Sequence, residues 1–172
     1  VTILSSNLAS ARVVGEWGFS ALVEVDGHCV LFDAGRNPDT VLRNARALDV
    51  DLSCVTDVVL SHFHFDHVGG LQVLLEDARS RNPGAFRHFH VADGFFLPRR
   101  VRGGAGEEWN GMIGMRAFLQ AQGAEIHVYD QATEILPAVW TTGPITRTHD
   151  EQTFSTGIEV QRNGAWTTDF VP

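Results

Sequence analysis

The sequence predicts a layered α/β fold, and two patterns carry that prediction. Short apolar runs rich in β-branched residues, such as residues 55–60, alternate along the chain with segments whose apolar residues recur every three or four positions. The first pattern is typical of buried strands and the second of amphipathic helices. Because the two patterns intermix instead of separating into blocks, we expect an α/β or α+β arrangement in which helices pack on a sheet.

The first elements are a strand at residues 1–4 and two further strands at residues 19–25 and 28–32. Asp26 and Gly27 separate the second and third of these runs. An Asp-Gly pair readily adopts the positive φ angles of a tight turn, so these two strands are expected to form a hairpin.

Two helices are expected on either side of the strand at residues 55–60. Pro38 and Asp39 mark the start of the earlier helix, because proline suits the first helical turn. Its apolar face consists of Val41, Leu42, Ala45 and Leu48. The later helix follows Gly69-Gly70, and Pro83-Gly84 ends it.

The second half of the chain gives weaker signals. The expected elements are strands at 89–92, 126–129 and 139–142, a short helix at 115–122, and a hairpin of 158–161 and 166–170 that turns at Gly164. Residues 98–114 are rich in glycine and are expected to be irregular. Arg99, Arg100 and Arg102 lie in that segment, where a solvated linker is favoured over a mobile lid that offers guanidinium groups to an anion.

Composition limits the possible functions. The chain has 172 residues, of which 44% are hydrophobic and 20% charged. This composition is typical of one soluble domain, here expected to span residues 1–172. The formal net charge of -8 argues against nucleic acid as a partner. All 13 basic residues are arginine, which excludes a lysine Schiff base and a P-loop lysine.

The two cysteines, Cys29 and Cys54, lie in apolar runs and are expected to be buried thiols. No apolar run approaches the ~20 residues that a membrane span needs, and no signal peptide opens the sequence. We therefore expect a cytoplasmic protein with no membrane partner. A homo-oligomer is compatible with the composition.

The densest histidine segment follows the strand at 55–60 and reads His62-Phe63-His64-Phe65-Asp66-His67. On an extended backbone His62 and His64 project to the same side, so their imidazoles can bind one ion. Asp66 and His67 add a carboxylate oxygen and a third nitrogen, or bind a second ion. Such nitrogen and oxygen ligands suit zinc, manganese or iron and leave positions open for water, as catalytic sites do. The alternative is that these are surface or helix-capping residues without a metal.

At this motif the sequence resembles the metallo-β-lactamase superfamily, whose hallmark is an H-x-H-x-D-H loop at a strand end. The resemblance extends to the hairpin at residues 18–35, the strand at 57–61 and Gly69-Gly70-Leu71. Within the superfamily the chain is most similar to the dihydropterin ribofuranosylaminobenzene-phosphate synthase-like group of hydrolases. Weaker similarities to that group lie at residues 90–95 and 143–147. The resemblance implies an αββα sandwich.

Carried onto this sequence, the resemblance implies that His62 and His64 bind a first ion and that Asp66 and His67 bind a second. It also implies that Asp33 lies close behind the ligands. From the residues alone, Asp33 could equally be a turn carboxylate that binds nearby N–H groups. The superfamily's third histidine, bridging aspartate and last histidine are not placed in the sequence, where His149 is only a weak substitute for the third histidine, so the fold is expected to be incomplete at its C-terminus.

Other residues are weaker candidates for contact with substrate or ligands. His90 lies on a predicted strand and could face the pocket. His149 follows a strand and a Gly-Pro turn, but its position is more similar to the family's arginine-bearing loop, which includes Arg147. The remaining histidines, at strand edges or turns, are assigned no function: His28, His88 and His127.

Together these observations predict a metal-dependent hydrolase that acts on a small molecule. One or two divalent ions, zinc first, would provide a metal-bound hydroxide that attacks an ester, phosphoester or related bond. Asp66 would orient this nucleophile as well as bind metal. Two alternatives remain: a non-catalytic or truncated fragment that acts through an interface, and a pterin-linked transferase, which the group's name implies.

Overall fold

The computed structural model describes residues 1–103, 110–143, 145 and 157–169. Its largest element is a six-stranded sheet with the order β1-β2-β3-β4-β5-β7. The strands are β1 (Thr2–Ser5), β2 (Ser20–Val25), β3 (His28–Phe32), β4 (Val55–Leu60), β5 (His88–Ala92) and β7 (Glu125–Tyr129). β3, β4, β5 and β7 are parallel, so their carboxyl ends meet at one edge of the sheet.

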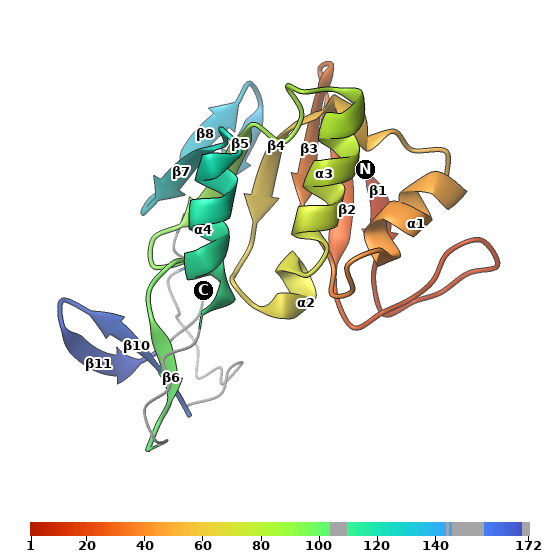
Figure 1. Cartoon of the computed structure of the whole chain (residues 1–172). Coiled ribbons are helices and arrows are strands. Elements are labelled where there is room, and N and C mark those ends of the chain that lie inside the picture. The colour runs from red at the N-terminus through yellow and green to blue at the C-terminus, as the bar shows by residue number, and fades with distance from the viewer. Residues whose placement is uncertain (104–109, 144, 146–156, 170–172) are drawn as a thin grey trace.

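Helices cover one face of this sheet, as Figure 1 shows. They are α1 (Thr40–Ala47), α3 (Leu71–Arg81) and α4 (Gly111–Ala121). Between the helices and the sheet lies a core whose side chains are almost fully excluded from water, among them Leu31, Val58, Leu74 and Phe89. Helices and sheet intermix along the chain, and the predicted layered α/β architecture is confirmed.

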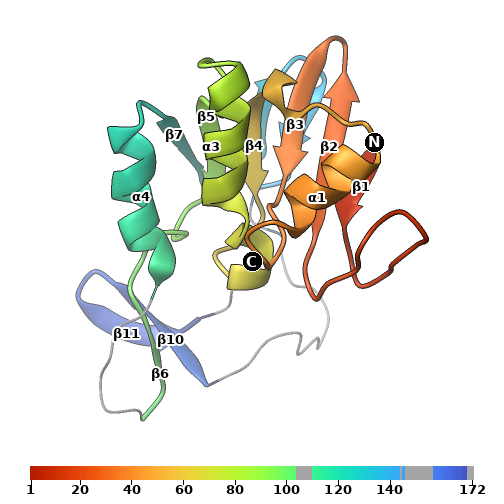
Figure 2. The same ribbon diagram turned by 45° about the vertical axis from the view of Figure 1, so that its right-hand side comes forward.

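Two smaller sheets accompany the large one. β8 (Thr133–Leu136) and β9 (Val139–Thr141) form a hairpin, which lies behind the six-stranded sheet, on the side away from the helices, in Figure 2. The second small sheet has the order β11-β10-β6. Its strands are β6 (Arg99–Val101), β10 (Ile158–Arg162) and β11 (Ala165–Thr168).

The predicted hairpin of β2 and β3 is confirmed, with φ angles of 47° at Asp26 and 83° at Gly27. The structure adds several short elements to those expected, including strand β8 and a 3₁₀ turn at Leu52–Cys54. A single helical turn, α2 (Phe65–Val68), lies within the histidine motif. Four residues are too few to show a helical period, which is why the pattern did not predict this turn.

Strand β6 is another addition, and it corrects the expectation of a solvated linker around Arg99. The strand pairs with β10, almost sixty residues further along the chain. The Arg99 side chain is only 3% exposed, donates a hydrogen bond to Asp169 over 2.7 Å, and lies 3.7 Å from the centre of the Phe63 ring. Pairing at such a sequence separation leaves no local signal.

The two cysteines are joined in a disulfide, so the expectation of buried thiols was wrong. Cys29 lies on β3, where its register partner on β4 is Val55, the neighbour of Cys54. This parallel pairing brings the two Cα atoms within 5.8 Å of one another. Disulfides are typical of oxidising compartments, and the cytoplasmic location stays a prediction. Among the described residues, none of the helices combines the length and the apolar character needed to cross a bilayer.

Removing this disulfide is expected to destabilise the fold by about 3 kcal/mol, because the cross-link limits the unfolded chain across a separation of 25 residues. Urea unfolding of the oxidised chain, with and without dithiothreitol, measures the difference. A variant with both Cys29→Ser and Cys54→Ser serves as the control, since it should unfold at the midpoint of the reduced chain in either condition. Equal midpoints for the oxidised and reduced wild-type chain would contradict the prediction.

Candidate metal centre

The histidine motif lies in the loop between β4 and α3, at the carboxyl edge of the parallel strands. His64 has an extended backbone and precedes α2, so Asp66 and His67 lie in the first turn of that helix. The loop packs directly against the chain after β3. A Cβ atom on Gly69 would lie only 1.8 Å from the Arg36 carbonyl oxygen, so this close approach requires glycine.

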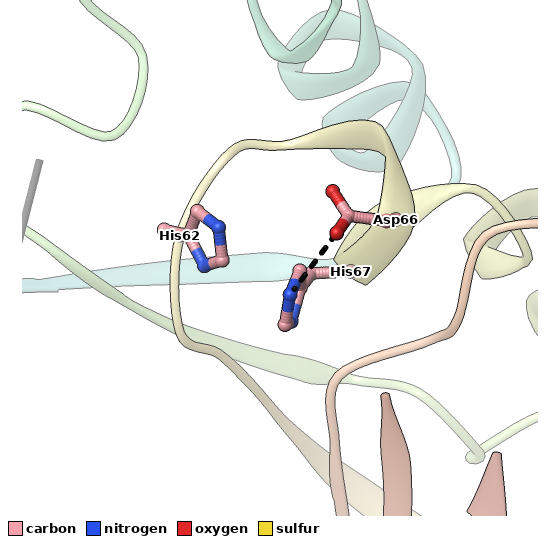
Figure 3. A group of neighbouring side chains, drawn as sticks. All are labelled: His62, Asp66 and His67. Carbon is pink, nitrogen blue, oxygen red and sulfur yellow. Dashed lines mark ion pairs between the residues drawn. The ribbon is translucent and has the colours of Figure 1, made fainter. Parts of the chain in front are cut away.

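His62, Asp66 and His67 converge at this edge, as Figure 3 shows. One ligand atom from each of these three side chains lies within 4.8 Å of the others. The Nε2 atom of His67 is 3.6 Å from the nearer carboxylate oxygen of Asp66. The rings of His62 and His67 have centroids 4.1 Å apart.

His64 completes the motif beside this group. Its Nδ1 atom lies 3.1 Å from His62 Nε2. The family resemblance implies that His62 and His64 bind one ion and that Asp66 and His67 bind another. In the structure His62 is close to both of these pairs. Its Nε2 atom faces His64, and its side chain also belongs to the three-residue group with Asp66 and His67.

Asp33 lies directly behind these ligands. It follows β3 in the left-handed backbone region, with φ of 56°, and its residue is 1% exposed. Its carboxylate accepts hydrogen bonds from the Ser61 backbone N–H over 2.8 Å and from the Ser61 hydroxyl over 2.7 Å. The other partner is His67 Nδ1 at 2.6 Å. Ser61 and His67 are distant from Asp33 in the sequence. A turn carboxylate would instead accept from N–H groups of its own turn.

These contacts determine which ring nitrogens are free to bind metal. Because His67 Nδ1 faces the carboxylate of Asp33, that nitrogen carries the proton and Nε2 keeps its lone pair. The Ser61 hydroxyl donates to Asp33, so it accepts from His62 Nδ1 at 3.0 Å. His62 Nε2 is then also unprotonated. Both Nε2 atoms are therefore prepared as ligands.

The surroundings shift the pKa values of the histidines. Burial, aided by the charges of His67 and His64, lowers the pKa of His62 to about 4. The pKa of His64 is also lowered, chiefly by burial. Burial lowers the pKa of His67 as well, but the hydrogen bond and charge of Asp33 outweigh it, so the net shift is upward. A neutral His62 at pH 7 is the form that binds metal.

The donor set fits a divalent ion. Two nitrogen ligands of one tetrahedral zinc ion lie ~3.3 Å apart, because each bond is about 2.0–2.1 Å long. The separations of 3.1 Å between His62 and His64 and 3.6 Å between His67 and Asp66 are close to this value. Imidazole nitrogens and a carboxylate oxygen without thiolate are typical of zinc sites that keep a position for water or substrate.

A cavity of about 310 Å³ opens beside the motif, lined in part by Ser61 and His62. Its opposite wall comes from the three-stranded sheet and includes Arg99 and Arg162. Arg162 pairs with Asp93 over 2.8 Å, and the two side chains are 48% and 56% exposed. Arg162 was not a candidate from the sequence, and for Arg99 a solvated linker was favoured over a lid that binds anions. Their positions depend on the pairing of β6 with β10, which has no local signal.

His90, another candidate from the sequence, lies away from the motif. His90 is buried on β5, where Nε2 is 2.8 Å from Asp57 and Nδ1 is 2.9 Å from the Tyr129 hydroxyl. It lines a separate, mostly apolar cavity of about 480 Å³ between the large sheet and the β8–β9 hairpin. Arg147 and His149 lie outside the described residues.

The sheet and this centre define an α/β protein with a histidine and carboxylate metal motif at the carboxyl edge of its strands. Residues 18–81 match the family model described as the metallo-beta-lactamase superfamily. The matched segment contains Asp33 and the whole histidine motif. The resemblance recognised in the sequence is therefore confirmed.

Two curated proteins of Methanocaldococcus jannaschii are similar to part of the chain. "Uncharacterized protein MJ0448" is 38% identical over 77 residues, which are 45% of this chain and 30% of the relative. The protein named 7,8-dihydropterin-6-methyl-4-(beta-D-ribofuranosyl)-aminobenzene-5'-phosphate synthase is 31% identical over 78 residues, which are 43% of this chain and 26% of the relative. The chain thus matches less than a third of the length of either relative.

Among solved structures, human tRNase Z, short form, has a TM-score of 0.46 at 16% identity, covering 74% of this chain and 44% of that one. A quorum-quenching N-acyl homoserine lactone hydrolase has a TM-score of 0.47 at 15% identity, covering 73% and 50%. The metallo-β-lactamase MIM-1 of Novosphingobium pentaromativorans has a TM-score of 0.43 at 20% identity, covering 69% and 41%.

Proposed function

We propose that the chain is a metal-dependent hydrolase that acts on an ester, phosphoester or related bond of a small molecule. The observation that carries this proposal is the convergence of ligand atoms from His62, Asp66 and His67 within 4.8 Å of one another. The motif lies beside a cavity large enough for a small substrate. Zinc is the metal that the imidazole and carboxylate ligands of the motif favour.

A divalent ion held there would supply Lewis acidity that activates water and polarises the bond to be cleaved. His62 and His67 offer their Nε2 atoms to the ion, and His67 binds it in its neutral form. Asp33 holds the ring of His67 through the 2.6 Å contact, which prevents the ring from turning away. The Asp66 carboxylate has two oxygens, so one can bind metal while the other accepts a hydrogen bond from the attacking water.

The cavity favours an anionic substrate such as a phosphoester. Arg99 forms a buried ion pair with Asp169 at 2.7 Å. Among the described residues, Arg162 pairs with the half-exposed Asp93, and such surface pairs contribute little. A phosphate can therefore displace the Asp93 carboxylate and accept bidentate hydrogen bonds from the Arg162 guanidinium.

Zinc reconstitution with a substrate screen tests this proposal. The metal-depleted chain is dialysed against zinc, its metal content is measured by elemental analysis, and hydrolysis is followed with a nitrophenyl phosphodiester, a nitrophenyl acetate, a lactone and a sulfate ester. We expect zinc-dependent hydrolysis, with the largest kcat/KM for the phosphodiester. Zinc uptake without hydrolysis of any of these compounds would contradict the hydrolase and favour a non-catalytic chain that acts through an interface.

A pterin-linked transferase is the second candidate, because the synthase named above is 31% identical to this chain over 78 residues. It predicts zinc-dependent consumption of a reduced pterin together with a phosphorylated sugar donor. Chromatographic analysis of that mixture distinguishes it from the hydrolase, which would release inorganic or organic phosphate without consuming the pterin.

A further inference from the structure

A second group of metal-binding side chains lies on the sheet, away from the histidine motif. It consists of His88 on β5 and of Glu125 and His127 on β7. His88 and Glu125 are register partners on neighbouring parallel strands. His127 is two residues beyond Glu125 and so projects from the same face of the sheet.

The spacing of these three side chains fits one metal ion. Their ligand atoms all lie within 4.8 Å of one another. His88 Nδ1 is 3.2 Å from His127 Nε2 and 3.5 Å from the nearer Glu125 oxygen. Both values are close to the ~3.3 Å that separates two ligands of a tetrahedral zinc ion.

Neighbouring residues hold two of the three ligands in place. Arg87 donates to Glu125 Oε1 over 2.8 Å, and the other oxygen, Oε2, is the one that faces His88. The ring of His127 stacks on that of His90 at 5.1 Å, and Asp57 fixes His90 through a contact of 2.8 Å. Ligands held in this way lose little conformational freedom when they bind an ion.

We propose that His88, Glu125 and His127 form a second divalent-metal site, suited to zinc, that is independent of the histidine motif. His88 and Glu125 are the first residues of β5 and β7, so the group lies toward the amino ends of these strands. The histidine motif, in contrast, follows the carboxyl end of β4. Side-chain exposures of 32% for His88 and 48% for Glu125 leave room for water to complete the coordination. An ion there would fasten the edge strand β7 to β5.

The test uses the full chain with His62→Ala and His67→Ala, which removes two ligands of the motif. Titration with zinc alone, followed by calorimetry and elemental analysis, is expected to show one equivalent still bound. Adding His88→Ala and His127→Ala should abolish that binding, whereas adding His28→Ala, a histidine outside both groups, should leave it unchanged. Failure of hydrolysis in the wild-type chain would not affect this result.

Two outcomes would overturn the proposal: no zinc bound by the His62→Ala/His67→Ala chain, or equal binding after His88 and His127 are replaced. If the fourfold variant does not fold, Glu125→Gln on the double-variant background removes one anionic ligand at a half-exposed position. A zinc affinity lowered by roughly tenfold or more is then expected. Unchanged affinity would count against the site.

Discussion

Replacing His62 and His67 together by alanine should abolish zinc-dependent hydrolysis, with a loss on the order of 10³-fold or more in kcat/KM. Metal activation of water and substrate contributes several kcal/mol to such reactions, and each ~1.4 kcal/mol is a factor of ten. The two rings supply both nitrogen ligands of the three-residue group that also contains Asp66. Without them, one carboxylate and His64 remain, which is too few ligands to hold zinc at the motif.

The matched control for this variant is His28→Ala, because His28 belongs to neither metal-binding group among the described residues. It should keep the zinc content and the hydrolysis rate of the wild type. Circular dichroism checks that the double variant is folded. If the double variant retained its zinc-dependent activity, the motif would not be the catalytic site. Zinc that stays bound without activity would instead be assigned to His88, Glu125 and His127.

The sequence predicted those parts of the molecule that short stretches of chain determine. Asp26 and Gly27 determine a turn by their own backbone preferences, so the β2–β3 hairpin could be predicted. The histidine motif could also be recognised, because its four candidate metal ligands are nearly contiguous. Asp33 was identified only through the resemblance, since nothing in its own turn indicates that its carboxylate contacts His67.

The disulfide, the buried Arg99 and the group formed by His88 and His127 were missed because each depends on pairing between distant segments. The disulfide requires β3 and β4 to lie side by side, and the buried Arg99 requires β6 to pair with β10. His88 and His127 are 39 residues apart in sequence. One signal was present: His88 and His90 alternate on one strand, as His127 and Tyr129 do on another. If the two strands had been predicted to be neighbours, this alternation would have placed all four residues on one face.

Asp33→Asn is expected to weaken zinc binding at the motif by about 10- to 100-fold without preventing folding, the effect typical of removing a carboxylate that orients a metal-binding histidine. Asparagine tolerates the left-handed backbone that Asp33 adopts, so the turn after β3 should persist. The buried carboxylate, however, accepts from the Ser61 backbone, the Ser61 hydroxyl and His67 at once. An amide offers only one acceptor oxygen, so at least one of these donors loses its partner.

The loss should fall on His67. Ser61 can turn its hydroxyl toward another acceptor, but His67 Nδ1 needs an acceptor at its present position to keep Nε2 directed at the metal. Zinc titration in a chain that also carries His88→Ala and His127→Ala isolates the affinity of the motif. Asp57→Asn is the control, because Asp57 is a buried carboxylate on the same sheet that holds His90 instead. It should lower stability and leave zinc affinity at the motif unchanged. Equal zinc affinities for Asp33→Asn and the parent chain would show that Asp33 serves only the fold.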